Sequence, residues 1–246
     1  MKISQSALLV IACAWTVATL SVPSGAAQAP STPDQTVAAL KQNLQESQQR
    51  LRQYEWVETT VISLKGEEKA RKQQRAYYGA DGKLTKIPIG EPQPEAAKGG
   101  RGGGRGGGRV KEKNVENKKD DMKDYMERAV ALIHKYVPPS PAQIQKAKDA
   151  GKMRVSPPQQ GKARIEFPDF LQPSDLLAID LDATAARLAA ISVATYLEKR
   201  EDAVTMDVAF GALADGTSYA ATTTLDAKAK NIRVVVTNSG HRPLAR

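Results

Sequence analysis

The chain has 246 residues, a formal net charge of +9 and a single cysteine, Cys13. One cysteine excludes intrachain disulfide frameworks, zinc ribbons and CxxC redox sites, because each of these needs at least two thiols. A chain of this length can bury an ordinary hydrophobic core, and this core must stabilise the fold without disulfide bonds.

Residues 1–27 are predicted to be a secretory signal peptide. Met1-Lys2 is followed by an apolar run over residues 7–22 and by small residues up to Ala29, and cleavage is expected between Ala27 and Gln28. The apolar run is shorter than the roughly 20 residues that a membrane-spanning helix needs. We therefore expect an exported, periplasmic protein whose mature chain has no transmembrane segment. The alternative is a lipoprotein anchored at Cys13, within the lipobox-like Val10-Ile11-Ala12-Cys13.

A helix is expected from Thr32 to Gln53, followed by three strands. Thr32 is suited to the N-cap, Pro33 to the first helical position and Gln35 to the capping box. Aromatic and β-branched residues, bounded by turn signals, then predict strands over 54–64, 71–78 and 83–89. The turns are expected at Lys65-Gly66 and at Asp81-Gly82, and the second suits a type I′ turn.

The connection that follows is a Gly/Arg-rich insertion at about residues 91–116. The segment 98–119 holds eight basic and two acidic residues, so it carries most of the net charge. No aromatic residue interleaves its arginines, which argues against nucleic-acid binding by stacking. We expect a flexible loop, with a weak, salt-sensitive contact to an anionic envelope surface as its secondary role. The candidate contact residues are Lys98, Arg101, Arg105 and Arg109.

The rest of the chain is predicted to form two helices followed by a series of strands. A helix from Asn117 to Tyr136 has an apolar face, and a short one capped by Ser140-Pro141 reaches Ala150. Alternating apolar and polar residues then predict six strands, near 164–167, 177–181, 187–197, 204–210, 219–225 and 232–236. The predicted fold is one α+β domain over 28–246. It is a curved antiparallel sheet of about nine strands, an open half-barrel covered by two or three helices.

This order resembles the periplasmic half-barrel family of lipoprotein carriers and their relatives, the LolA, LolB and RseB group. The likeness is carried by the signal peptide, by the first helix leading into YEWVET, and by the strands over 187–237 with a helical insert before them. It covers most of the mature chain and is one of topology, without a diagnostic motif. The resemblance implies a hydrophobic ligand or an acylated protein as the partner, held between sheet and helices.

Six apolar side chains are candidates to line such a hollow. Trp56 begins the first strand, and the methionines of the second helix offer an adaptable lining. The candidates are Trp56, Met122, Met126, Ile133, Met206 and Phe210.

The sequence contains no recognised catalytic or metal-binding motif. His134 and His241 lack partners at ligand spacing and are expected on the surface. The acidic pairs Asp120-Asp121, Asp180/Asp182 and Glu201-Asp202 are explained as helix ends, strand faces and turns. We expect a non-enzymatic envelope protein without cofactor or metal that binds an apolar ligand or acyl group. The alternative is an interaction protein whose hollow is filled by its own helices.

Overall fold

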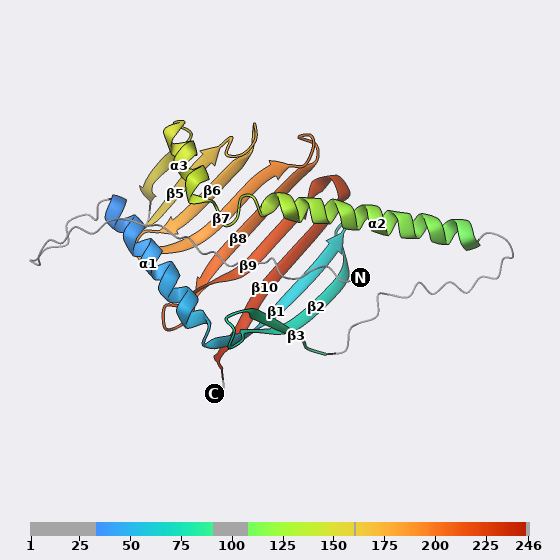
Figure 1. Ribbon diagram of the computed structural model, residues 1–246, viewed down its shortest axis with the longest axis horizontal. Helices are drawn as coiled ribbons and strands as arrows, with labels where there is room; N and C mark the ends of the chain where they lie inside the picture. Colours follow the sequence, from blue (N-terminus) through green and yellow to red (C-terminus); the bar gives the residue numbers. More distant parts are fainter. Residues whose placement is uncertain (1–32, 91–107, 160, 245–246) are drawn as a thin grey trace, which may run out of the picture.

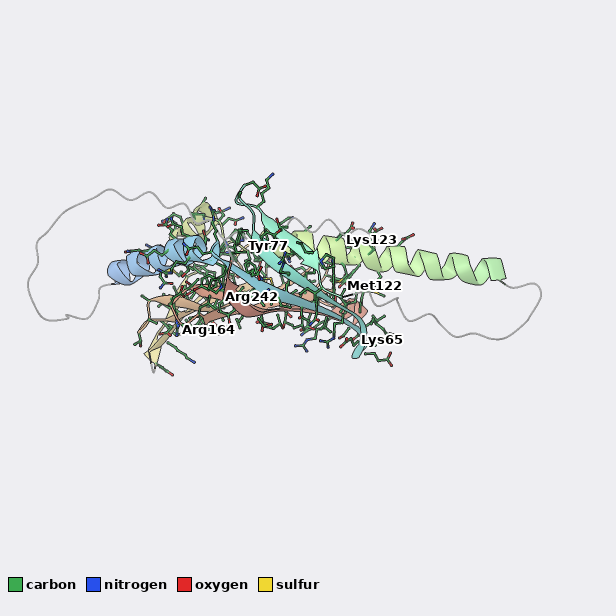
Figure 2. All side chains as sticks on the ribbon, turned by 90° about the horizontal axis from the view of Figure 1, so that it is seen from below. Lys65, Tyr77, Met122, Lys123, Arg164 and Arg242 are labelled. Carbon is green, nitrogen blue, oxygen red and sulfur yellow. The ribbon has the colours of Figure 1, made fainter. Side chains whose placement is uncertain are left out.

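The structure is a computed structural model that describes residues 33–90, 108–159 and 161–244. In these residues one open antiparallel sheet of ten strands carries three α-helices on one of its faces (Figure 1). Figure 2, turned by 90°, shows the two long helices on the same side of the sheet. The predicted α+β fold with a curved, helix-covered antiparallel sheet is therefore confirmed.

The element bounds follow the chain in this order. The helices are α1 (Pro33–Leu51), α2 (Gly108–Ile133) and α3 (Pro141–Asp149). Before α2 come β1 (Tyr54–Leu64), β2 (Glu67–Tyr78) and β3 (Leu84–Pro88). After α3 come β4 (Arg154–Gln159), β5 (Lys162–Pro168), β6 (Leu176–Asp182), β7 (Arg187–Tyr196), β8 (Ala203–Ala212), β9 (Ser218–Ala227) and β10 (Ile232–Pro243).

The sheet is a meander that is interrupted once. Its strand order is β3-β2-β1-β10-β9-β8-β7-β6-β5-β4, so the first and last strands of the chain pair with each other inside the sheet. β3 and β4 form the two opposite edges. Because they are consecutive strands, the chain between them must travel from one edge to the other, and α2 and α3 lie on this path (Figure 1).

The main core lies between the sheet and the C-terminal half of α2. Alternation places Leu177, Val193, Met206 and Leu225 in register on one face of β6–β9. Ala129 and Ile133 of α2 belong to the same buried cluster as these four residues. Burial of each such large apolar side chain contributes about 1.5–3 kcal/mol, which explains how an otherwise polar helix is held on the sheet.

Two elements differ from the sequence-based prediction: an additional strand and an earlier start of the second helix. The tenth strand, β4, was not predicted because Pro157 and Pro158 interrupt its pattern, and proline is tolerated there only because β4 is an edge strand. α2 begins at Gly108 rather than at Asn117, so the last part of the Gly/Arg-rich insertion is helical. The helix ends at Ile133, and a tighter turn leads to Tyr136, whose N–H donates to the Ile133 carbonyl at 2.9 Å.

The hairpin turns separate into two types. Lys65 and Gly66 both have positive φ, 55° and 84°, as a type I′ turn requires. At Asp81-Gly82 only Gly82 has positive φ, 73°, and its N–H donates to the Gly79 carbonyl at 2.9 Å. The type I′ prediction for Asp81-Gly82 is therefore wrong, because one extra residue lets glycine alone take the left-handed position.

Candidate functional site

A cavity of about 170 Å³ lies between the C-terminal half of α1 and the helix-covered face of the sheet. Its floor comes from β1, β8, β9 and β10, one side comes from the end of β2 and the start of β3, and α1 forms the roof. The residues that line it are Leu44, Ser47, Gln48, Leu51, Arg52, Trp56, Glu58, Tyr78, Gly82, Leu84, Phe210, Ser218, Tyr219, Ala220, Thr223, Val236, Asn238 and His241.

Aromatic rings from four strands meet in the wall of this cavity. The imidazole of His241 stacks on Trp56 with ring centroids 5.7 Å apart, and it approaches Tyr219 at 4.1 Å. Tyr78 packs against Trp56 in a tilted arrangement, with ring centroids 5.9 Å apart. Burial lowers the pKa of His241, because desolvation disfavours the imidazolium, and burial raises the pKa of the Tyr78 phenol.

Hydrogen bonds fix the orientation of the tryptophan. The indole Nε1 of Trp56 donates to Asn238 Oδ1 at 3.0 Å, and the amide of Asn238 donates to the Ala220 carbonyl at 2.8 Å. Trp56 is only 6% exposed, so its N–H needs such a partner. β1, β9 and β10 are thereby joined at one point, and the indole is fixed in the wall of the cavity.

A buried ion pair stands beside the aromatic wall. Lys86 Nζ on β3 lies 2.7 Å from the carboxylate of Glu58 on β1, and the two side chains are only 12% and 10% exposed. Breaking a buried pair by removing one partner costs about 3–5 kcal/mol, since the other charge is left uncompensated. Glu58 lines the cavity, so the wall contains a carboxylate whose charge is neutralised by Lys86.

The roof is attached to the β8–β9 turn on the far side of the cavity. Ser47 is 2% exposed, and its hydroxyl oxygen accepts the Ser218 N–H at 3.0 Å. Arg50 donates to Thr217 Oγ1 at 3.1 Å and pairs with Glu46 at 3.2 Å. These bonds hold α1 over the sheet, with the cavity between the helix and the strands.

The structure divides the six predicted lining residues into two groups. Trp56 and Phe210 line the cavity under α1. The other four, Met122, Met126, Ile133 and Met206, lie where α2 packs on the sheet, in or against the two buried clusters. The hollow was expected between the sheet and its covering helices. α2 is closely packed on the sheet, and the cavity lies under α1.

One of the two histidines is placed differently from the expectation. His134 is exposed on the surface, as expected. His241 was expected on the surface as part of a tail, but it belongs to β10 and lines the cavity. This position could not be predicted, because Trp56 and Tyr219 are brought to His241 only by the pairing of β1, β10 and β9. The register between β1 and β10 shifts between Glu55 and Val57.

The acidic pairs have structural explanations. Asp120 and Asp121 are exposed on α2. Asp180 pairs with Arg164 at 3.2 Å and Asp182 with Arg187 at 3.1 Å. Glu201-Asp202 lies at the β7–β8 turn, where the Asp202 carbonyl accepts the Leu197 N–H. In the described part of the chain, no group of histidine, cysteine and carboxylate side chains is arranged to hold a metal ion.

A second polar cluster, at the end of α2, is built for stability. Asp175 is 2% exposed and accepts the backbone N–H groups of Phe170, Leu171 and Gln172, together with the hydroxyl of Tyr136. The Tyr136 oxygen is also 2.9 Å from Thr195 Oγ1. Desolvation, assisted by the bond to Asp175, raises the pKa of Tyr136. The hydrogen bonds of this cluster are made within the protein. None of its residues lines the cavity under α1 or a second pocket next to Glu55.

Several predictions lie outside the described residues. They are the signal peptide 1–27, its cleavage site at Ala27 and Gln28, the lipobox at Cys13, and the loop residues Lys98, Arg101 and Arg105. Arg109 falls in the first turn of α2, where only the backbone is described. Across the described ranges, no helix has both the length and the apolar character needed to cross a membrane.

Neither family models nor curated proteins provide a match to this chain.

Proposed function

We propose that the protein is an exported, non-enzymatic binding protein of the cell envelope that holds an apolar ligand or acyl group in the cavity beneath α1. The observation that carries this proposal is the cavity itself, with Leu44, Trp56, Phe210 and Val236 in its wall. A concave, mostly apolar site with a few oriented polar groups is the usual form of a small-ligand site.

The size of the cavity limits what enters it. Pockets for drug-sized ligands enclose roughly 300–1,000 Å³, and an apolar cavity of about 150 Å³ holds one benzene molecule. The cavity under α1, at about 170 Å³, therefore accommodates one ring or a short alkyl segment. A long acyl chain requires α1 to move away from the sheet, or it inserts only its end.

The first test is direct recovery of the ligand. Lipids and small molecules that co-purify with the protein are identified by mass spectrometry under native conditions and after denaturation. The second test follows the fluorescence of Trp56 during titration with hexanoate, octanoate and palmitate, in the full chain with Trp15→Phe so that one tryptophan remains. We expect a saturable change, because the ligand replaces water against the indole. No recovered ligand and no fluorescence change would count against the proposal.

A cavity-filling variant makes the titration specific. Ala220 lines the cavity, and Ala220→Leu adds three carbon atoms to its wall. We expect this variant to bind at least about tenfold more weakly, since the added side chain occupies the volume that the ligand needs. The matched control is Ala194→Leu, the same change at an exposed position of β7, which should leave binding unchanged.

A second candidate is an interaction protein of the envelope that has no ligand. The observation in its favour is the close packing of α2 on the sheet, where Ala129 is fully buried and Ile133 is 6% exposed. In this case the basic segment makes the contact with anionic envelope components. Replacing Arg101, Arg105 and Arg109 with serine should then abolish binding to anionic vesicles at low salt, whereas unchanged binding would make the segment a spacer.

A further inference from the structure

The lining of the cavity includes a cationic side chain, that of Arg52. Arg52 follows directly after α1 and lines the cavity, with its guanidinium beside Gly82 of the β2–β3 turn. Its side chain is exposed, and no carboxylate in the described residues pairs with it. Its neighbour Arg50 is different, because Glu46 and Thr217 already occupy that guanidinium.

Two polar groups of the wall are already satisfied within the protein. The indole N–H of Trp56 is bonded to Asn238, and the charge of Glu58 is neutralised by Lys86. An apolar group of a ligand can therefore contact this part of the wall without leaving these two protein groups unpaired. Charge complementarity is needed only at the mouth, where Arg52 lies.

We propose that the ligand is a small organic carboxylate, with an aromatic ring or short alkyl chain against Trp56 and its carboxylate on Arg52. This inference rests on the proposed function and specifies the ligand class. The planar guanidinium of arginine presents paired N–H donors that match the two oxygens of a carboxylate. The cavity volume of about 170 Å³ suits the ring or chain alone and leaves the charged group at the mouth.

The test uses three ligands that differ only in their polar end. They are 3-phenylpropanoate, 3-phenylpropan-1-ol and 3-phenylpropan-1-amine, titrated at pH 7 by calorimetry and by Trp56 fluorescence in the full chain carrying Trp15→Phe. The expected order of affinity is carboxylate, then alcohol, then ammonium. The advantage of the carboxylate over the alcohol should be about three- to tenfold at low salt. It should shrink at high salt because Arg52 is exposed and screened.

A variant and its matched control locate the effect. Arg52→Gln should lower the affinity for the carboxylate to that for the alcohol and leave the affinity for the alcohol unchanged. Lys83→Gln removes a charge from the same turn, but Lys83 does not line the cavity, so this control should preserve the preference.

The outcomes separate this inference from the proposed function. Equal affinity for the three ligands, or an equal loss for all of them in Arg52→Gln, overturns the carboxylate inference and leaves the cavity as a binding site. Binding of none of the three overturns both proposals. A preference that disappears in Lys83→Gln as well shows that the general field of the turn is responsible, and it also overturns the assignment to Arg52.

Discussion

Trp56 connects parts of the chain that are far apart in the sequence. Its ring packs against both Tyr78 of β2 and His241 of β10, and its N–H donates to Asn238. The only other tryptophan, Trp15, is in the predicted signal peptide. A single side chain therefore reports both on the cavity and on the pairing of the first and last strands.

His241 should make the stability of the protein depend on pH. Its pKa in the folded state lies below the value of about 6.5 found in an unfolded chain, because the site is desolvated. Below pH 6.5 the unfolded chain therefore binds the proton first, and the stability from the neutral imidazole is lost as pH falls toward the folded-state pKa. His241→Phe keeps a ring in the stack but cannot titrate.

The measurement compares urea midpoints of the parent and His241→Phe at pH 7.5, 6.0 and 5.0. The parent should lose more stability than the variant between pH 7.5 and 5.0, while all other titrating groups contribute equally to both. Parallel pH profiles would show that the imidazole is not desolvated in the folded protein.

Tyr136 should contribute to stability mainly through its hydroxyl group. The side chain is completely buried, and the hydroxyl donates to Asp175 and contacts Thr195. Tyr136→Phe leaves these two buried groups with one partner fewer, at a cost of about 1–3 kcal/mol. The matched control is Tyr196→Phe, which removes one exposed hydrogen bond to the Pro173 carbonyl and should cost less than about 0.5 kcal/mol. Equal urea midpoints for the two variants would contradict the structural role given to Tyr136.

Among the helices, α1 has the most direct effect on the cavity, because it forms the roof and is bonded to the β8–β9 turn. Ser47→Ala removes the acceptor of the buried Ser218 N–H, which costs about 1–2 kcal/mol. We expect faster hydrogen exchange at Ser218 and easier proteolysis within α1, because the roof is then held by fewer bonds. Gln42→Ala, an exposed position on the same helix, serves as the control and should leave both measurements unchanged. Unchanged exchange at Ser218 in Ser47→Ala would show that this bond does not hold the roof.

Elements could be predicted where their sequence pattern is local, and not where they depend on the whole sheet. The inward residues of β6–β10 were predictable because alternation is local, and the bounds of α1 were predictable from its cap and apolar spacing. β4 was not, since Pro157 and Pro158 are compatible with a strand only at an edge, and edges are set by the whole sheet. The helix that covers the cavity could not be predicted, because α1 and α2 have similar amphipathic patterns and only packing decides which one closes on the sheet.

The site residues were predictable only in part, and for a related reason. Trp56 was recognisable as a large ring at the start of a strand. His241, Asn238 and Arg52 were not, because their meaning depends on the register between β1 and β10 and on the end of α1. Glu58 and Lys86 look like ordinary exposed charges in the sequence, and the pairing of β2 with both β1 and β3 brings them together as a buried pair.

Both edges of the sheet carry residues that disfavour pairing with other chains. The free part of β2 beyond β3 carries Glu67, Glu68, Lys69, Arg71 and Lys72, all exposed. β4 carries two consecutive prolines at the opposite edge. Charges and prolines at edges both disfavour the addition of a further strand.

The position of β10 predicts a single cooperative unfolding transition for the whole molecule. β10 lies between β1 and β9, so the three N-terminal strands reach the rest of the sheet only through it. In urea, the fluorescence of Trp56 and the far-ultraviolet circular dichroism of the sheet should therefore change with the same midpoint. A chain ending at Asn231 should lose both signals, because β1 then has no partner on that side and the Trp56 stack loses His241 and Asn238. Separate midpoints, or a truncated chain that keeps its native circular dichroism, would show that β4–β9 fold without the terminal pair.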